Sequence, residues 1–256
     1  MAEKKSEKKN KSKAKFISEK KLTLKALSDE FEQINEISLD QITLIVENRD
    51  PVLLEAEVVL PTDEMVVVES ENPTHSVFLL ELLAGRTSPS KGQLLWNQKN
   101  YFGEDAALDP HHFLGSYFES FKSPGSLTFR TLWQKFVESE DELNGLIAAF
   151  DLDEVCDIPF SKTPYAYQKL SQLVLPILKR PQILILEDPA YGLSEDQWLN
   201  YLDFVQFYQR RGFLRHMFLT NSHPTALIHL NHQKLYIADG MIYLDQKTGF
   251  KKVSHF

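Results

Sequence analysis

The sequence feature that most constrains the fold is the stretch QILILEDP at residues 182–189. Four apolar residues run directly into Glu187 and Asp188, and a proline follows. An unbroken apolar run of this length predicts a strand buried on both faces, at the centre of a parallel sheet under helices. Open α/β sheets place their chemistry beyond the carboxyl ends of such strands, so the two acids are candidate functional residues. The alternative is an ordinary buried strand that ends in a solvated acidic turn.

The composition indicates a sizeable core and an uneven distribution of charge. The 256 residues, 43% of them hydrophobic, suffice for one large α/β domain or two small ones. Residues 1–22 carry nine lysines and three glutamates, a net charge of +6, and because the whole chain carries −8, the remainder carries −14. A body this acidic argues against nucleic acid as the main partner. The Lys-rich N-terminal tail could contact an anionic membrane surface, and a disordered, solubilising tail is the alternative.

We expect a chain without a membrane span, a signal peptide or an internal disulfide. No apolar run approaches the ~20 residues that a membrane helix needs, and the Lys-rich start is not followed by an apolar block. Cys156 is the only cysteine, which fits a reducing compartment. His229 and His232 could share a helix face, but no third ligand stands beside them, so we predict no metal site.

The hydrophobic pattern predicts strands and helices in alternation. The expected strands cover residues 38–46, 52–60, 65–69, 91–101, 183–186, 217–220, 235–238 and 241–244. One helix is expected to start after Asn72, with Pro73 in its first turn and Gly85 as its C-cap. Four further helices are expected at residues 138–150, 163–179, 195–211 and 224–230. Pro176 should kink the helix at 163–179. Asp239 and Gly240 predict a hairpin turn between the last two strands.

Five segments, in consistent order and spacing, carry a family resemblance. They are LLAGRTSPSKGQLLWNQK at 82–99, LGSYFES with SLTFRTLW at 114–120 and 126–133, LKRPQILILEDPAYGLSED at 178–196, and KLYIADGMI at 234–242. Over residues 38–246 the chain resembles the nucleotide-binding subunit of an ABC transporter. The resemblance implies an α/β, P-loop-NTPase-like ABC ATPase domain, with a mainly parallel central sheet, flanking helices, an antiparallel β edge and a small helical subdomain. It divides the chain into a disordered tail and linker at 1–37 and the domain at 38–250, whose helical subdomain covers about 110–175.

The segment that corresponds to the family's phosphate-binding loop has lost the residues that loop needs. A loop of the form GxxxxGK[ST] binds phosphate through backbone N–H groups and a lysine, and its hydroxyl holds Mg²⁺. The corresponding residues are SENPTHSVF at 70–78, without a glycine. Pro73 removes a backbone donor, Ser76 replaces the lysine and Val77 replaces the hydroxyl. The remaining positions of interest in this degenerate loop are Ser70, Asn72 and His75, and His75 is more simply an exposed loop histidine.

The other motifs of the family are altered as well. The signature LSGGQ corresponds to TPYAY, in which bulky side chains replace the serine and glycines. Glu187 and Asp188 reverse the family's Asp-Glu order, Glu119 takes the Q-loop glutamine position and Asn221 takes the switch-histidine position. The signature positions are Thr163, Pro164, Tyr165, Ala166 and Tyr167. ATP and Mg²⁺ would be the family's ligands, and with every motif altered we assign this chain no cofactor.

The resemblance and its losses together predict a catalytically degenerate subunit. Its role would be structural or regulatory, in a membrane transport complex. Its partners would be a membrane permease, a second ABC ATPase subunit in a dimer, or both, at the cytoplasmic face of a membrane. The aromatic segment 113–136 could dock the permease, or could simply be the core of the helical subdomain. Two alternatives remain open: a low-activity ATPase with Glu119, Glu187 and Asp188 around Mg²⁺, and a soluble scaffold or regulatory protein that kept the fold.

Overall fold

The computed structural model describes residues 33–46, 50–62, 64–102, 113–121, 125–222, 227, 232–246 and 249–252. The Lys-rich tail, most of the expected 224–230 helix and His229 lie outside the described residues. Among the described residues, no helix combines the length and the apolar character needed to cross a bilayer.

A seven-stranded, mainly parallel sheet forms the centre, as predicted. Its strand order is β11-β10-β9-β3-β8-β7-β6. The parallel strands are β3 (Met65–Ser70), β6 (Leu114–Tyr117), β7 (Ile183–Leu186), β8 (His216–Leu219) and β9 (His232–Ala238), and the antiparallel edge is β10 (Met241–Gln246) and β11 (Gly249–Lys252). Asp239 and Gly240, both at positive φ, form the predicted turn between β9 and β10.

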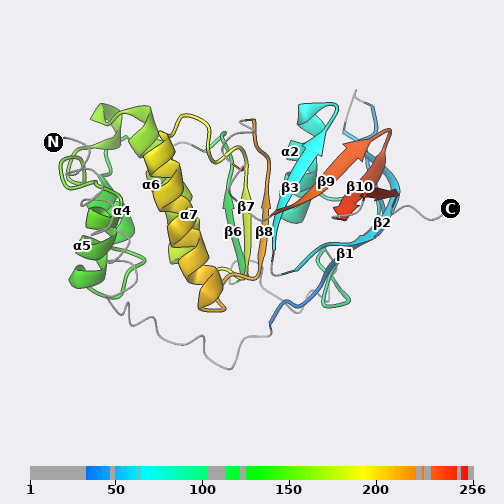
Figure 1. The fold of residues 1–256 in the computed structure, drawn as a ribbon, viewed down its shortest axis with the longest axis horizontal. Helices are drawn as coiled ribbons and strands as arrows, with labels where there is room; N and C mark the ends of the chain where they lie inside the picture. Colours follow the sequence, from blue (N-terminus) through cyan, green and yellow to red (C-terminus); the bar gives the residue numbers. More distant parts are fainter. Residues whose placement is uncertain are drawn as a thin grey trace.

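The four residues of β7 are all buried, which confirms the prediction of a strand covered on both faces. Leu184 and Leu186 face a core that includes residues of α4 (Phe129–Trp133), α5 (Glu140–Ala149), α6 (Tyr165–Leu178) and α7 (Glu195–Arg210). Ile183 and Ile185 face a second core, formed with α2 (Pro73–Leu83) and the antiparallel sheet. In Figure 1, α4 to α7 lie to the left of β6, β7 and β8, and α2 lies to the right of them. Side chains that alternate across one strand therefore join the two layers.

The separate antiparallel sheet has the order β2-β1-β4-β5. Its strands are β1 (Ile37–Leu44), β2 (Leu53–Val59), β4 (Lys91–Trp96) and β5 (Lys99–Asn100). The prediction of one strand over 91–101 was therefore wrong, because the segment folds back on itself. Asn97 and Gln98 have φ values of 48° and 64°, the left-handed values that a tight two-residue hairpin turn requires.

Strand β6 was not predicted, because its sequence LGSY is short and only half apolar. It pairs in parallel with β7, and Gly115 lets α6 approach it closely. A Cβ atom at Gly115 would lie 3.0 Å from the Pro176 carbonyl oxygen and 3.0 Å from the Pro176 Cβ. Helix α6 contains Pro176 and continues past it to Leu178.

The aromatic segment 113–136 contributes mainly to the interior. Its buried aromatic residues are Phe113, Tyr117, Phe118, Phe129 and Trp133. The ring of Trp133 meets the rings of Phe129 and Phe150 edge-on, at centroid distances of 5.6 and 6.0 Å. The core interpretation is therefore confirmed for Tyr117, Phe129 and Trp133, which belong to the core that includes residues of α4 to α7, whereas Phe113 and Phe118 belong to the second core. Phe121, which is 49% exposed, is the large hydrophobic residue of this segment on the surface.

Candidate functional site

Helix α2 begins where the sequence predicts, and its first turn lies at the position that corresponds to the family's phosphate-binding loop. Asn72 is the N-cap, and its side-chain oxygen accepts a hydrogen bond from the Thr74 N–H at 3.2 Å. The Asn72 carbonyl oxygen accepts from the His75 N–H at 2.8 Å. Pro73 has no N–H to offer. The first-turn amides of Thr74 and His75 are thus bonded within the chain. At the other end Ala84 is the C-cap, and Gly85, with φ 69°, directly follows it.

Ser76, at the lysine position, is buried and points back into its own helix. Its hydroxyl donates to the Pro73 carbonyl oxygen at 2.9 Å and lies 3.3 Å from the Ser70 hydroxyl oxygen. Ser70, in turn, donates to the carbonyl oxygen of Asn72. Val77 follows inside the helix with an apolar side chain. This loop therefore presents no cation toward a phosphate.

A cavity of about 340 Å³ lies beside this loop and carries acidic side chains. Asn72 and His75 line it together with three carboxylic acids, Asp50, Glu71 and Asp239. Like charges repel strongly in a partly desolvated space, so this lining disfavours a polyphosphate.

Asp188, at the carboxyl end of β7, forms hydrogen bonds to residues that follow β8. Its φ is 42°, its N–H donates to the Thr220 hydroxyl oxygen at 3.0 Å, and one carboxylate oxygen accepts from the Ser222 N–H at 3.0 Å. The other carboxylate oxygen accepts from the Ser222 hydroxyl. Asn221, at the switch-histidine position, lies between these two partners of Asp188. The acid thus links β7 to the segment that follows β8.

Glu119, at the Q-loop position, is bonded on both carboxylate oxygens. One oxygen forms an ion pair with Lys169 of α6, and the other accepts from the Tyr165 hydroxyl at 2.8 Å. The Glu119 N–H donates to a carboxylate oxygen of Glu187 at 2.9 Å. The structure therefore brings together the Q-loop, β7 and signature positions that the sequence analysis singled out.

Lys169 was missed by the sequence analysis, although its spacing carries a signal. It lies four and eight residues before Leu173 and Ile177, both buried, and so shares the inner face of α6 with them. Its side chain is 0% exposed. A lysine on an otherwise apolar helix face indicates a buried anionic partner, because an unpaired charge is costly to bury.

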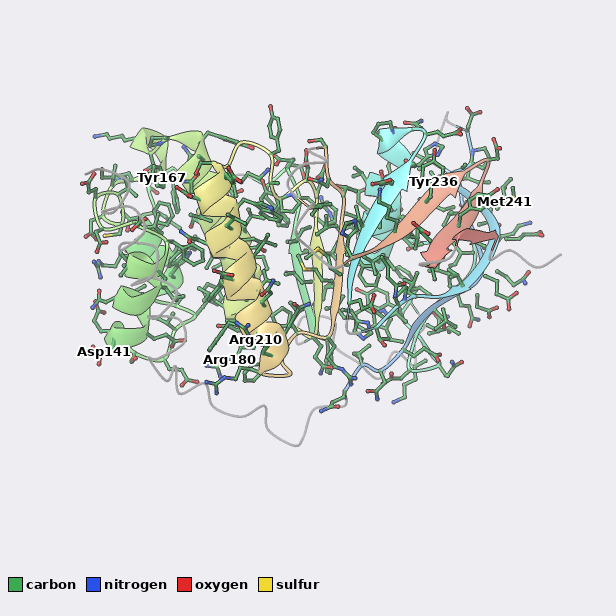
Figure 2. All side chains as sticks on the ribbon, in the orientation of Figure 1. Asp141, Tyr167, Arg180, Arg210, Tyr236 and Met241 are labelled. Atoms are coloured by element: carbon green, nitrogen blue, oxygen red, sulfur yellow. The ribbon has the colours of Figure 1, made fainter. Side chains whose placement is uncertain are left out.

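The signature positions form the start of α6. Thr163 is buried and its hydroxyl donates to the Pro159 carbonyl oxygen at 3.1 Å. Pro164 is the N-cap, and Tyr165, Ala166 and Tyr167 make the first turn, in which the Tyr167 N–H donates to the Pro164 carbonyl oxygen at 3.1 Å. In Figure 2, Tyr167 marks the upper end of α6. Arg180, just after α6, and Arg210, at the end of α7, lie at the opposite end of these two helices.

Burial shifts the pKa values of several groups in this cluster. It raises the pKa of the Tyr165 hydroxyl to about 12, and Glu119 adds to this effect. It lowers the pKa of Lys169, whereas the charge of Glu119 acts in the opposite direction. It raises the pKa of Glu187, although the hydrogen bond from the Glu119 N–H favours the charged form.

The raised pKa of Glu187 predicts how its replacement by glutamine alters stability. Between the ordinary pKa of 4.5 and the raised value, the folded chain binds more protons than the unfolded chain, so the free energy of unfolding falls as pH rises. Glutamine does not ionise, so Glu187→Gln avoids this fall in the free energy of unfolding. Its amide oxygen can still accept the hydrogen bond from the Glu119 N–H. Urea unfolding should show the variant to be more stable than the wild type at neutral pH, with the difference shrinking below pH 4.5. A variant that is less stable at neutral pH would contradict this assignment.

Comparisons with known proteins support the fold. No protein-family model matches the sequence. The chain is 21% identical over 208 residues to the ABC transporter ATP-binding protein YtrE of Bacillus subtilis, and the match covers 77% of this chain and 89% of that protein.

Solved structures share the fold at low sequence identity. The ATP-binding subunit of an ABC transporter superposes with a TM-score of 0.65 at 17% identity, over 80% of this chain and 87% of that one. A dimeric ATP-binding cassette, solved in a post-hydrolysis state with ADP and Pi, superposes with a TM-score of 0.65 at 13% identity, over 86% of this chain and 100% of that one. The chain is thus similar in sequence to an ABC transporter ATP-binding protein, and its fold is that of the ATP-binding subunits of ABC transporters.

Proposed function

We propose that this chain is a catalytically degenerate ABC-type ATP-binding subunit with a structural or regulatory role in a membrane transport complex. One observation carries the proposal: the carboxylate oxygens of Glu119 and Asp188 are all bonded to groups of the same chain. A carboxylate that holds Mg²⁺ or orients an attacking water must offer an oxygen to it. Here those oxygens hold Lys169, Tyr165 and Ser222 instead.

The phosphate-loop position supports the same conclusion. The amides of Thr74 and His75 are bonded to Asn72, Ser76 is uncharged and turned inward, and the adjacent cavity is acidic. These residues do not fit ATP with Mg²⁺ in the way the family binds it, since phosphate binding needs free amides and a lysine.

We further propose how the subunit is organised and assembled. Residues 38–250 would form one ABC ATPase-like domain with a helical subdomain at about 110–175, and residues 1–37 a tail and linker. The subunit would pair with a second ABC ATPase subunit or bind a membrane permease, at the inner face of the membrane, where the Lys-rich tail could touch anionic lipid. A permease contact would fall on Phe121, whose ring is 49% exposed and lies 5.3 Å from the Arg86 guanidinium, since five other aromatics of the segment are buried and Phe136 is partly buried.

The first experiment is titration of the purified chain with a fluorescent ATP analogue, with and without Mg²⁺, together with thermal unfolding. A ligand at tenfold its Kd adds ~1.4 kcal/mol of stability to a protein that binds it. We expect no binding and no thermal shift at millimolar nucleotide, whereas a competent ABC ATPase subunit in the same assay should show both. Mg²⁺-dependent binding with turnover that Glu187→Gln abolishes would favour the low-activity ATPase.

The second experiment tests the assembly. The tagged chain should co-purify from detergent-solubilised membranes with a permease or another ABC subunit, and Phe121→Ala should weaken the permease contact. A chain that stays in the soluble fraction without either partner would favour the scaffold alternative.

A further inference from the structure

The Lys169 side chain is fully buried, and its ammonium group contacts two oxygens and two aromatic rings. It forms an ion pair with Glu119 and donates to the Asp188 carbonyl oxygen at 2.7 Å. The nitrogen also lies 5.5 Å from the ring centre of Tyr117 and 5.3 Å from that of Tyr191. An ammonium group has three N–H donors. Here two oxygens accept hydrogen bonds from it, and two aromatic faces add cation–π attraction.

These contacts join the consecutive elements α6 and β7 to Glu119, which lies beyond the end of β6 and 50 residues before Lys169. Lys169 belongs to the second turn of α6, Glu119 follows β6, and Asp188 follows β7. The other oxygen of Glu119 is held by Tyr165, one turn earlier on α6. Two side chains of one helix therefore bind the same carboxylate at the carboxyl edge of the sheet.

We propose that Lys169, acting through Glu119, is a built-in latch that fixes the N-terminal end of α6 on the carboxyl edge of β6 and β7. The latch is a property of the folded chain alone. It requires no ligand, and it holds the start of α6 in one position whether or not a nucleotide binds elsewhere. The proposal thus goes beyond the function proposed above and can fail or succeed separately from it.

The energetics of buried ion pairs explain why such a contact acts as a latch. Separating the pair would leave Lys169 charged in a low-dielectric interior, so small displacements of α6 are strongly opposed. An exposed pair lacks this property, since water replaces the lost partner. The chain contains such a pair as an internal comparison: Lys234 and Glu69 are 3.0 Å apart, with side chains 41% and 40% exposed.

A double-mutant cycle tests whether the pair acts as a unit. Glu119→Gln should raise the unfolding equilibrium constant on the order of 100-fold, because it leaves the buried Lys169 ammonium without its anionic partner. Lys169→Met should raise it less, because the Glu119 carboxylate that it leaves behind is 31% exposed and water can solvate it. The double variant should be within about tenfold of the wild type, since a buried pair replaced by neutral groups of similar size is often tolerated. The cycle of Lys234→Met with Glu69→Gln is the matched control, with a coupling below about fivefold. Additive effects of Lys169→Met and Glu119→Gln would overturn the proposal.

Hydrogen exchange supplies a readout that global destabilisation alone would not produce. In Lys169→Met, amide exchange should accelerate selectively in the first two turns of α6 and at Glu119, relative to α7 and β3. Lys234→Met should leave this pattern unchanged. Uniform acceleration across the chain would show that Lys169 contributes only to overall stability and would overturn the latch.

A milder variant covers the case in which Lys169→Met fails to fold. Tyr165→Phe removes only the hydroxyl that binds Glu119 and leaves Lys169 in place. It should produce the same local acceleration at the start of α6, with a loss of stability of about fivefold in the unfolding constant. Unchanged exchange in this variant would count against the proposal.

Discussion

Replacing Trp133 with alanine is expected to lower the free energy of unfolding by about 4 kcal/mol. The indole is 0% exposed, packs edge-on against Phe129 and Phe150, and donates from its ring N–H to the Ser171 carbonyl oxygen at 3.4 Å. Alanine would leave a cavity between α4, α5 and α6 and would remove the indole donor from the Ser171 carbonyl oxygen. Chemical denaturation followed by circular dichroism measures the change.

Phe121→Ala is the matched control for this prediction. Its ring is half exposed and contacts Phe118 and Arg86 at the surface, so its removal should alter stability by less than about 1 kcal/mol. The comparison separates the two interpretations of the aromatic segment, because a docking residue affects partner binding and a core residue affects folding. Equal losses of stability in the two variants would contradict the structure.

Replacing Gly115 with valine is expected to destabilise the fold by about 3 kcal/mol. The first added carbon would lie 3.0 Å from Pro176 Cβ, from the Pro176 carbonyl oxygen and from Pro181 Cγ. Two of the three atoms belong to rigid proline rings and one to the backbone, so none of them can turn away. The strain would push α6 from β6 and, through the same movement, separate Lys169 from Glu119.

Two further variants sharpen this test. Gly115→Ala should cost roughly 1 kcal/mol, since it introduces the close contact without the branched methyl groups. Ser116→Val, at the next position of β6 and on the opposite face, should change stability by no more than about 0.5 kcal/mol. Thermal and urea unfolding of the three variants rank them directly. A Gly115→Val variant as stable as Ser116→Val would show that α6 and β6 are not in close contact.

Periodic and local signals in the sequence were sufficient for much of the fold. The apolar run of β7, the Asn72-Pro73 start of α2 and the Asp239-Gly240 turn each follow from the chemistry of a few neighbouring residues, and each is present in the structure. The hairpin at Asn97 and Gln98 was missed, because neither residue is a glycine and the flanking residues continue a strand-like pattern. Strand β6 was missed because it is stabilised by pairing with β7, a partner about 70 positions away.

In the candidate site, too, some features follow from the sequence and others only from the tertiary structure. The sequence alone shows which residues stand at the motif positions, because this depends only on residue identity and spacing. They are Ser76, Glu119, Tyr165 and the pair Glu187-Asp188. The sequence by itself therefore determined the fold class and the family resemblance, and it predicts the loss of the phosphate-binding chemistry. What those residues do instead was decided by the tertiary structure alone. Lys169 and Glu119 are separated by 50 residues, and only the packing of α6 against β6 and β7 brings the buried ammonium to the partly exposed carboxylate.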